Sequence, residues 1–251
     1  MAADSKLLTI LELFAHDNST LSIDDIVQAL DCSVPQAYRY VKTLLEFDYL
    51  AKFNAHYILG PKIVQLDAII RFHDPLIQLC SRSLELISNE YDMDLVLMSQ
   101  VGKKIISVYH QKPVNHDNPI AFGRGTNMPL LRGAGSKALL AQLKTKEQNQ
   151  LVKLALEHGE TSPLGSDFDA IKHGLKAIKQ QGYAISHAEL DPNNAAIAIP
   201  LHLNEHYLPT ALTAIFSLQR MKTIDTALIV RILQHSQAQI LQQLAEHDTL
   251  V

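Results

Sequence analysis

The chain has 251 residues, of which 47% are hydrophobic and 19% charged, and its formal net charge is −4. This composition is that of a folded globular protein, and the charge argues against a uniformly basic nucleic-acid-binding protein while leaving room for a local basic face. Two cysteines, Cys32 and Cys80, are too few for a disulfide framework or a cysteine-based zinc cluster. Because the sequence lacks a secretory signal and an apolar run of the ~18 residues that span a bilayer, we expect a cytoplasmic protein without membrane association.

The first sixty residues predict three helices followed by a hairpin. Ser22 and Ser33 are predicted to cap the second and third helices, and Asp31 occupies the tight turn between them, where it tolerates a left-handed backbone. The short β-prone runs YLAKF and HYILG flank a turn. The predicted elements are a helix over 6–15, a second helix that begins after Ser22 and runs through residue 30, a third helix over 34–47, and a hairpin around 54–55. This order is the layout of a winged helix-turn-helix.

The third predicted helix carries the candidate DNA contacts. Val34, Ala37, Val41, Leu44 and Leu45 are expected on its apolar face, and polar side chains elsewhere offer donors for phosphates and base edges. Between residues 36 and 62 four basic residues face two acidic ones, although residues 1–62 hold five basic and eight acidic residues. That acidic balance keeps open a winged helix that contacts protein instead. The candidate DNA contacts are Gln36, Tyr38, Arg39, Lys42, Thr43 and, on the wing, Lys52.

The remainder predicts helices and strands in a mixed order. Gly102 marks the turn of a hairpin, DLVLMSQV-GK-KIISVYHQ, and Gly182 stands where a helix-ending glycine belongs. Thr145 and Gln148 fit a capping box. A helix is expected over 61–72, and a second follows the break at 73–75 and runs to about residue 91. Further helices are expected near 133–143, 146–157, 167–181 and 225–247. Strands are expected at YAISHAEL, AAIAIPLHL and TALTAIFSL.

Three blocks of this sequence together resemble the IclR family of bacterial transcription regulators. They are the run from LLTILELF to GPKIVQL, then PLLRGAGSKALLAQL, and then LKAIKQQGYAISHAELDPNNAAIAIPL. The resemblance covers nearly the whole chain in the correct order. It implies an α+β fold: a winged helix-turn-helix (1–60), a linker helix (61–74), and a GAF-like α/β domain (75–251) with an antiparallel sheet flanked by helices. It also implies a homodimer or homotetramer on a palindromic double-stranded operator, and a small organic acid as effector.

The glycine-rich stretch RGAGSKALLAQL does not fit the nucleotide-binding motifs that it superficially resembles. A phosphate loop requires a hydroxyl residue after the lysine, whereas Ala138 follows Lys137. A dinucleotide fingerprint requires a preceding strand and a βαβ unit, which the neighbouring sequence does not predict. The remaining interpretations are a tight helix start, or a helix start whose free amides attract a carboxylate.

The resemblance places this turn beside the effector pocket. Backbone amides of Ala134, Gly135 and Ser136 are therefore the candidate carboxylate contacts, while the role of Lys137 stays open. Ser186 occupies a position where relatives often place a polar ligand contact. Ala196, Ala214 and Phe216 stand where relatives that bind short acids have more polar side chains, so an aromatic or longer-chain acid is expected.

Other chemistry is less well supported by the sequence. His187, Glu189 and Asp191 alternate along a predicted strand and are read as a solvated or pocket-edge face rather than as a metal site. We expect no cofactor. An enzyme that uses the glycine turn to hold an anionic substrate is the remaining alternative, but neither a nucleophile nor an acid/base pair stands in a recognisable setting. The sequence therefore predicts an effector-controlled DNA-binding regulator that is not an enzyme.

Overall fold

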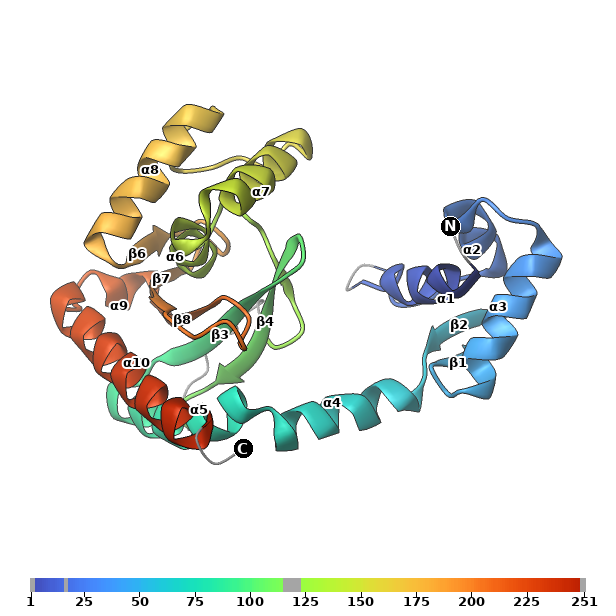
Figure 1. Ribbon diagram of the computed structural model, residues 1–251, viewed down its shortest axis with the longest axis horizontal. Coiled ribbons are helices and arrows are strands. Elements are labelled where there is room, and N and C mark those ends of the chain that lie inside the picture. The colour runs from blue at the N-terminus through green and yellow to red at the C-terminus, as the bar shows by residue number, and fades with distance from the viewer. Residues whose placement is uncertain (1–2, 16–17, 115–122, 249–251) are drawn as a thin grey trace. The chain divides into compact units, whose positions relative to one another are not determined.

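The computed structural model describes residues 3–15, 18–114 and 123–248. The chain consists of two compact units, residues 1–74 and 75–251, which are coloured from blue to red along the chain in Figure 1. Within the described part of the chain, no helix combines the length and the apolar character needed to cross a membrane.

The first unit is a winged helix-turn-helix followed by a helix, as predicted. The antiparallel strands β1 and β2 form the wing, with Phe53 paired to His56 at its tip. Its core contains Ile10, Ile26 and Ala37, each fully buried, and thus joins all three helices. The elements are α1 (Ala3–Glu12), α2 (Ile23–Leu30), α3 (Val34–Glu46), β1 (Leu50–Phe53), β2 (His56–Leu59) and α4 (Pro61–His73).

Local sequence signals account for the helix-turn-helix geometry. The amide of Asp25 donates to Ser22 Oγ at 3.1 Å, which caps α2. Asp31 ends this helix with φ = 44°, the left-handed conformation expected for it. One detail of the predicted apolar face is wrong. Val34 is 44% exposed at the first turn of α3, while Tyr40 is 8% exposed, because its large ring joins the hydrophobic core that also contains Leu50 and Tyr57 of the wing.

The second unit is built on one six-stranded antiparallel sheet in the order β5-β4-β3-β8-β7-β6. Figure 1 shows α5 and α10 along one face of this sheet and α6, α7 and α8 on the other. Two hydrophobic clusters correspond to the two faces. The elements are α5 (Pro75–Tyr91), β3 (Asp94–Val101), β4 (Lys104–Gln111), β5 (Asn127–Met128), α6 (Ala134–Gln142), α7 (Thr145–Glu157), α8 (Phe168–Gln181), β6 (Ala184–His187), β7 (Asn194–Leu201), β8 (Thr210–Ser217), α9 (Leu218–Met221) and α10 (Thr226–Asp248).

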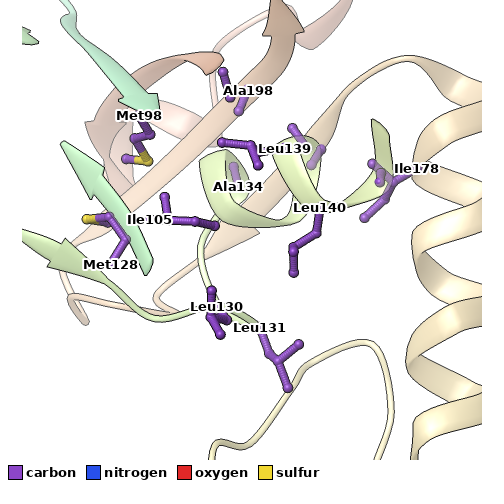
Figure 2. Close-up of a cluster of buried hydrophobic side chains, with 14 of the residues drawn as sticks. Met98, Ile105, Met128, Leu130, Leu131, Ala134, Leu139, Leu140, Ile178 and Ala198 are labelled. Atoms are coloured by element: carbon purple, nitrogen blue, oxygen red, sulfur yellow. The ribbon is translucent and has the colours of Figure 1, made fainter. Parts of the chain in front are cut away.

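Helix α6 is the central element of the helical layer on its face. Residues 134–141 are all buried. Figure 2 shows Ala134 and Leu139 of α6 beside the strands that carry Met98 and Ala198, with Ile178 of α8 beyond the helix. A helix enclosed in this way presents its N-terminus to the protein interior, where the partial positive charge of that end is less screened by water.

Two sequence predictions in this unit differ from the structure. The capping box at Thr145 does not form: Lys144 is the N-cap of α7, and the side-chain Nε2 of Gln148 donates instead to Leu140 O at 2.8 Å. The predicted strand YAISHAEL ends at His187, because Ala188 adopts φ = 54° and breaks the extended backbone. Glu189 and Asp191 therefore lie in the loop between β6 and β7.

Candidate functional site

The outer face of α3 presents the candidate DNA contacts. Tyr38 is 51% exposed, and Arg39 and Lys42 are also exposed. A spacing of three to four residues places Tyr38 and Lys42 on neighbouring turns of one helix face, and Arg39 lies beside them. Lys52 is exposed on β1 of the wing, so it belongs to a different element from the other candidates.

Two further candidates on α3 are engaged within the helix. Gln36 Oε1 accepts a hydrogen bond from the backbone amide of Ser33 at 3.1 Å, which leaves the side-chain NH₂ of this exposed residue for other partners. The half-buried Thr43 donates its hydroxyl to Arg39 O at 3.2 Å. Both side chains therefore form hydrogen bonds with the backbone of α3 or of its N-cap residue.

The cationic groups of this face are held only weakly by their neighbours. Lys42 Nζ lies 3.7 Å from Glu46 Oε1, with the two side chains 77% and 59% exposed. The Arg39 guanidinium lies 5.6 Å from the centre of the Tyr40 ring. Exposed ion pairs contribute about 0–1 kcal/mol, so a phosphate can replace these contacts at small cost.

A cavity of about 40 Å³ lies between the N-terminus of α6 and the sheet. Five of the seven predicted effector contacts line it, three from α6 and one each from β6 and β7. Its apolar lining includes Met98, Met128, Leu190 and Ile215. The predicted contacts that the structure brings together there are Ala134, Gly135, Ser136, Ser186 and Ala196.

The other two predicted wall residues, Ala214 and Phe216, do not line this cavity. They belong to the cluster on the face covered by α5 and α10, because successive side chains of a strand point to opposite faces of the sheet. Thr213 and Ile215 of β8 take the positions on the cavity side. The prediction from the sequence was thus displaced by one residue, and the wall gains a hydroxyl that it did not anticipate.

The N-terminus of α6 approaches the sheet closely. A Cβ atom on Gly135 would stand 2.6 Å from Thr213 Oγ1 and would also overlap Met98 Sδ. Only glycine lets the first turn reach this depth. Lys137 is the residue whose amide makes the first hydrogen bond of the helix, to Gly133 O at 3.2 Å. The preceding amides of the first turn have no acceptor within the helix itself.

Ser136 brings an unsatisfied hydroxyl to the cavity. The residue is 1% exposed, and its Oγ has no hydrogen-bond partner among the described residues. Nearby, the Thr213 hydroxyl donates to Met98 Sδ at 3.9 Å, and a thioether sulfur is a weak acceptor. A buried hydroxyl without a partner costs about 1–3 kcal/mol, which is unusual in a native structure and marks this wall of the cavity.

Lys137, whose role the sequence left open, is buried and shares an acidic partner with the amide of Gly133. Its Nζ donates to Ile185 O at 2.9 Å and forms an ion pair with Glu189 Oε1. The other oxygen of Glu189 accepts from the amide of Gly133 at 2.7 Å. Sequence reasoning placed Glu189 on a strand face, and the left-handed Ala188 was the feature that it could not foresee. Among the described residues, no group of three or more His, Cys, Asp and Glu could hold a metal ion.

The comparisons with known proteins agree with this architecture. Residues 5–52 match the IclR helix-turn-helix domain. Residues 72–242, more than half of the chain, match the model described as bacterial transcriptional regulator IclR C-terminal. The chain belongs to the IclR family. Membership implies a DNA-binding transcription regulator with a helix-turn-helix domain and a domain for a small-molecule effector.

Relatives within the IclR family are distant but cover most of the chain. The Pca operon regulatory protein of Acinetobacter baylyi is 24% identical over 238 residues, which cover 93% of this chain and 84% of that protein. The regulator XynR of Escherichia coli is 26% identical over 211 residues, 83% of each chain. Both are named as regulators, in agreement with the family.

Solved structures of IclR-type proteins share this fold. A putative IclR transcriptional regulator from Silicibacter sp. TM1040 superposes with a TM-score of 0.82 at 19% identity and covers 96% of each chain. An IclR homolog from Microbacterium hydrocarbonoxydans, solved in complex with 4-hydroxybenzoate, has a TM-score of 0.76 at 17% identity and covers 98% of this chain and all of that one (100%). At these identities the likeness concerns the fold.

Proposed function

We propose that this IclR-family regulator contacts operator DNA through Tyr38, Arg39 and Lys42 of α3, and that a small carboxylate bound at the N-terminus of α6 controls it. On the first point, the support is a helix-turn-helix whose third helix exposes two cations and a phenol on one face. Arginine, lysine and tyrosine are donors used for phosphates and base edges. Gln36 and Thr43 of α3 and Lys52 of the wing remain secondary candidates.

The single observation that carries the effector site is the buried, unpartnered hydroxyl of Ser136. It lies in the first turn of α6, where free backbone amides and the helix dipole favour an anion. A carboxylate has two oxygens that accept hydrogen bonds from such groups. A bound carboxylate would therefore satisfy donors that the protein alone leaves without acceptors.

The apolar part of the cavity supports a hydrophobic body attached to that carboxylate. Met98, Met128, Leu190 and Ile215 line it together with Ala196, and an aromatic or longer-chain acid would bury its body against them. A benzoate ring needs more room than about 40 Å³, and the unbranched methionine side chains can adopt other rotamers to provide it. The structural relative solved in complex with 4-hydroxybenzoate makes aromatic acids the first class to test.

We further propose that the chain acts as a homodimer or homotetramer on a palindromic operator. Helix α4 exposes several large apolar side chains without burying any residue, which is typical of a helix that packs against another surface in the assembled state. Val64, Ile69, Ile70 and Phe72 are exposed by 72%, 55%, 48% and 73%. Two copies related by a two-fold axis match the symmetry of a palindrome.

Selection of genomic DNA fragments by the purified protein tests the first proposal, since it yields a shared palindromic sequence if α3 reads an operator. Calorimetric titration with benzoate, 4-hydroxybenzoate, pyruvate and glyoxylate tests the second. Saturable binding of the aromatic acids is expected. Binding of the two-carbon acid alone would overturn the assignment of an apolar ligand body, and selection without any enriched sequence would support a winged helix that binds protein.

A further inference from the structure

One carboxylate already lies at the N-terminus of α6. Glu189 Oε2 accepts from the amide of Gly133 at 2.7 Å, and Oε1 is ion-paired with Lys137 Nζ. The two side chains are only 12% and 4% exposed. Glu189 thus reaches the helix from the β6–β7 loop and acts on this end of α6 as a capping acid would, although it is distant in the sequence.

The same loop forms a wall of the cavity. Glu189, Leu190 and Asp191 all line it, and a Cβ atom on Gly133 would stand 2.7 Å from Leu190 Cδ1. The loop is therefore anchored to the start of α6 twice, by the contacts of Glu189 with Gly133 and Lys137 and by Leu190, which lies against Gly133. A ligand that enters between the loop and α6 meets both anchors.

An effector carboxylate at this end of α6 would lie beside the Glu189 carboxylate. Two like charges close together in a site with little water repel strongly, and each disfavours the ionised form of the other. The buried Ser136 hydroxyl, unpartnered among the described residues, lies in the same cavity and is an independent sign that a ligand group belongs there. The two anions compete for the same donors.

We propose that Glu189 is an internal competitor of the effector and makes the pocket selective for anions. The inference rests on the proposed function, in which the ligand is a carboxylate. The entering carboxylate displaces Glu189 from Gly133 and takes over Lys137 as its counter-ion, which frees the β6–β7 loop. A neutral ligand offers Lys137 no replacement for Glu189, so it cannot complete this exchange without leaving a buried charge unpaired.

A purely structural role for Glu189 makes a different prediction. If the carboxylate only holds the glycine turn in place, its loss loosens the pocket for every ligand alike. If it competes, its loss favours anions alone. The comparison therefore needs a charged ligand and a neutral ligand of the same shape.

The test is calorimetric titration of the full chain with 4-hydroxybenzoate and its neutral counterpart 4-hydroxybenzamide. Glu189→Gln keeps an oxygen that can accept from Gly133 and removes the charge. We expect this variant to bind 4-hydroxybenzoate about ten-fold more tightly than the unmodified protein, with the affinity for 4-hydroxybenzamide changed by less than about three-fold. The double variant Lys137→Met/Glu189→Gln removes the cation as well, and it should lose that gain. It also retains a neutral interior if the single variant folds poorly.

Hydrogen exchange gives a readout that does not depend on the choice of acid. In the ligand-free chain, amides of residues 188–193 should exchange faster in Glu189→Gln than in the unmodified protein, and saturating 4-hydroxybenzoate should accelerate exchange there in the unmodified protein. Weaker binding of both ligands to Glu189→Gln, or protection of the loop by the acid, would overturn the competitor role while the proposed function stands. Failure of all forms to bind any acid of the panel would instead overturn the proposed function.

Discussion

Ser22 and Asp25 satisfy each other across the first turn of α2. The Asp25 amide donates to Ser22 Oγ at 3.1 Å, and the Ser22 amide donates to Asp25 Oδ2 at 2.7 Å. This reciprocal pair fixes where the second helix of the helix-turn-helix begins. The sequence predicts Ser22 as the N-cap at this position, and the structure adds the return bond from its amide to Asp25.

The hydrogen bond from the Ser22 amide, followed by that from the Ser22 hydroxyl, lowers the pKa of the Asp25 carboxyl from 3.8. A lowered folded-state pKa contributes stability that is present above the unfolded value and is lost as the pH falls through the folded value. We expect Asp25→Asn to reduce the melting temperature at neutral pH, and the difference from the unmodified protein to close below about pH 4. Scanning calorimetry across this range measures it, and a difference independent of pH would contradict the assignment.

Arg39→Ala should weaken operator binding by about ten-fold and reduce the slope of log affinity against log salt by about one, because one phosphate or base contact is lost. Fluorescence anisotropy with the selected operator at several salt concentrations measures both quantities. Lys103→Ala is the matched control, since it removes an exposed cation at the turn between β3 and β4 in the other unit. Equal affinity and slope for Arg39→Ala and the unmodified protein would remove α3 from the proposed interface.

Ser136→Ala separates ligand binding from stability. Removal of a buried hydroxyl that has no partner among the described residues should leave the free energy of unfolding unchanged or raise it by up to about 1 kcal/mol. The affinity for aromatic acids should fall about five-fold, which corresponds to the loss of one ordinary hydrogen bond of about 1 kcal/mol. Urea denaturation and calorimetric titration provide the two measurements.

Ser99→Ala is the control for this prediction. In the unmodified protein the buried Ser99 Oγ shares a 2.7 Å hydrogen bond with Thr210 Oγ1. Removal of the Ser99 hydroxyl should therefore lower the free energy of unfolding by about 1–3 kcal/mol without changing the affinity for acids. The proposed role of Ser136 is wrong if both variants lose stability equally and neither changes the binding of acids.

Thr213 and Ala214 test which face of β8 borders the effector. Thr213→Val preserves shape and removes a hydroxyl from the cavity, so acid affinity should change. Ala214→Ser places a hydroxyl in the apolar cluster against α5 and α10 and should destabilise the unit by about 1–3 kcal/mol with unchanged affinity. The reverse pattern in titration and denaturation experiments would restore the alignment deduced from the sequence.

Local signals in the sequence predicted the first unit well. Ser22, Asp31 and the apolar positions of α3 act over a few residues, where hydrogen-bonding and backbone preferences decide the conformation. The one misplaced pair, Val34 and Tyr40, reflects packing: a first-turn residue is exposed at the end of the helix, and a large ring fills the core from the edge of the apolar face.

The residues that line the cavity were only partly predictable, because they come both from a helix start and from strands. Ala134, Gly135 and Ser136 belong to a helix start that the sequence marks clearly. Ala214 and Phe216 were assigned from a strand register that is uncertain by one residue, and a shift of one residue exchanges the two faces of a strand. No spacing rule could reveal that Ser136 Oγ lacks a partner among the described residues.

The sequence by itself determined the order of elements, the helix-turn-helix and the glycine-rich start of α6, because each depends on neighbours along the chain. Only the tertiary structure decided what that helix start contacts. Lys137 and Glu189 are 52 residues apart, and their pairing depends on the left-handed turn at Ala188 and on burial between sheet and helices. A buried charge must find a partner wherever the fold supplies one, and such a partner cannot be read from local sequence.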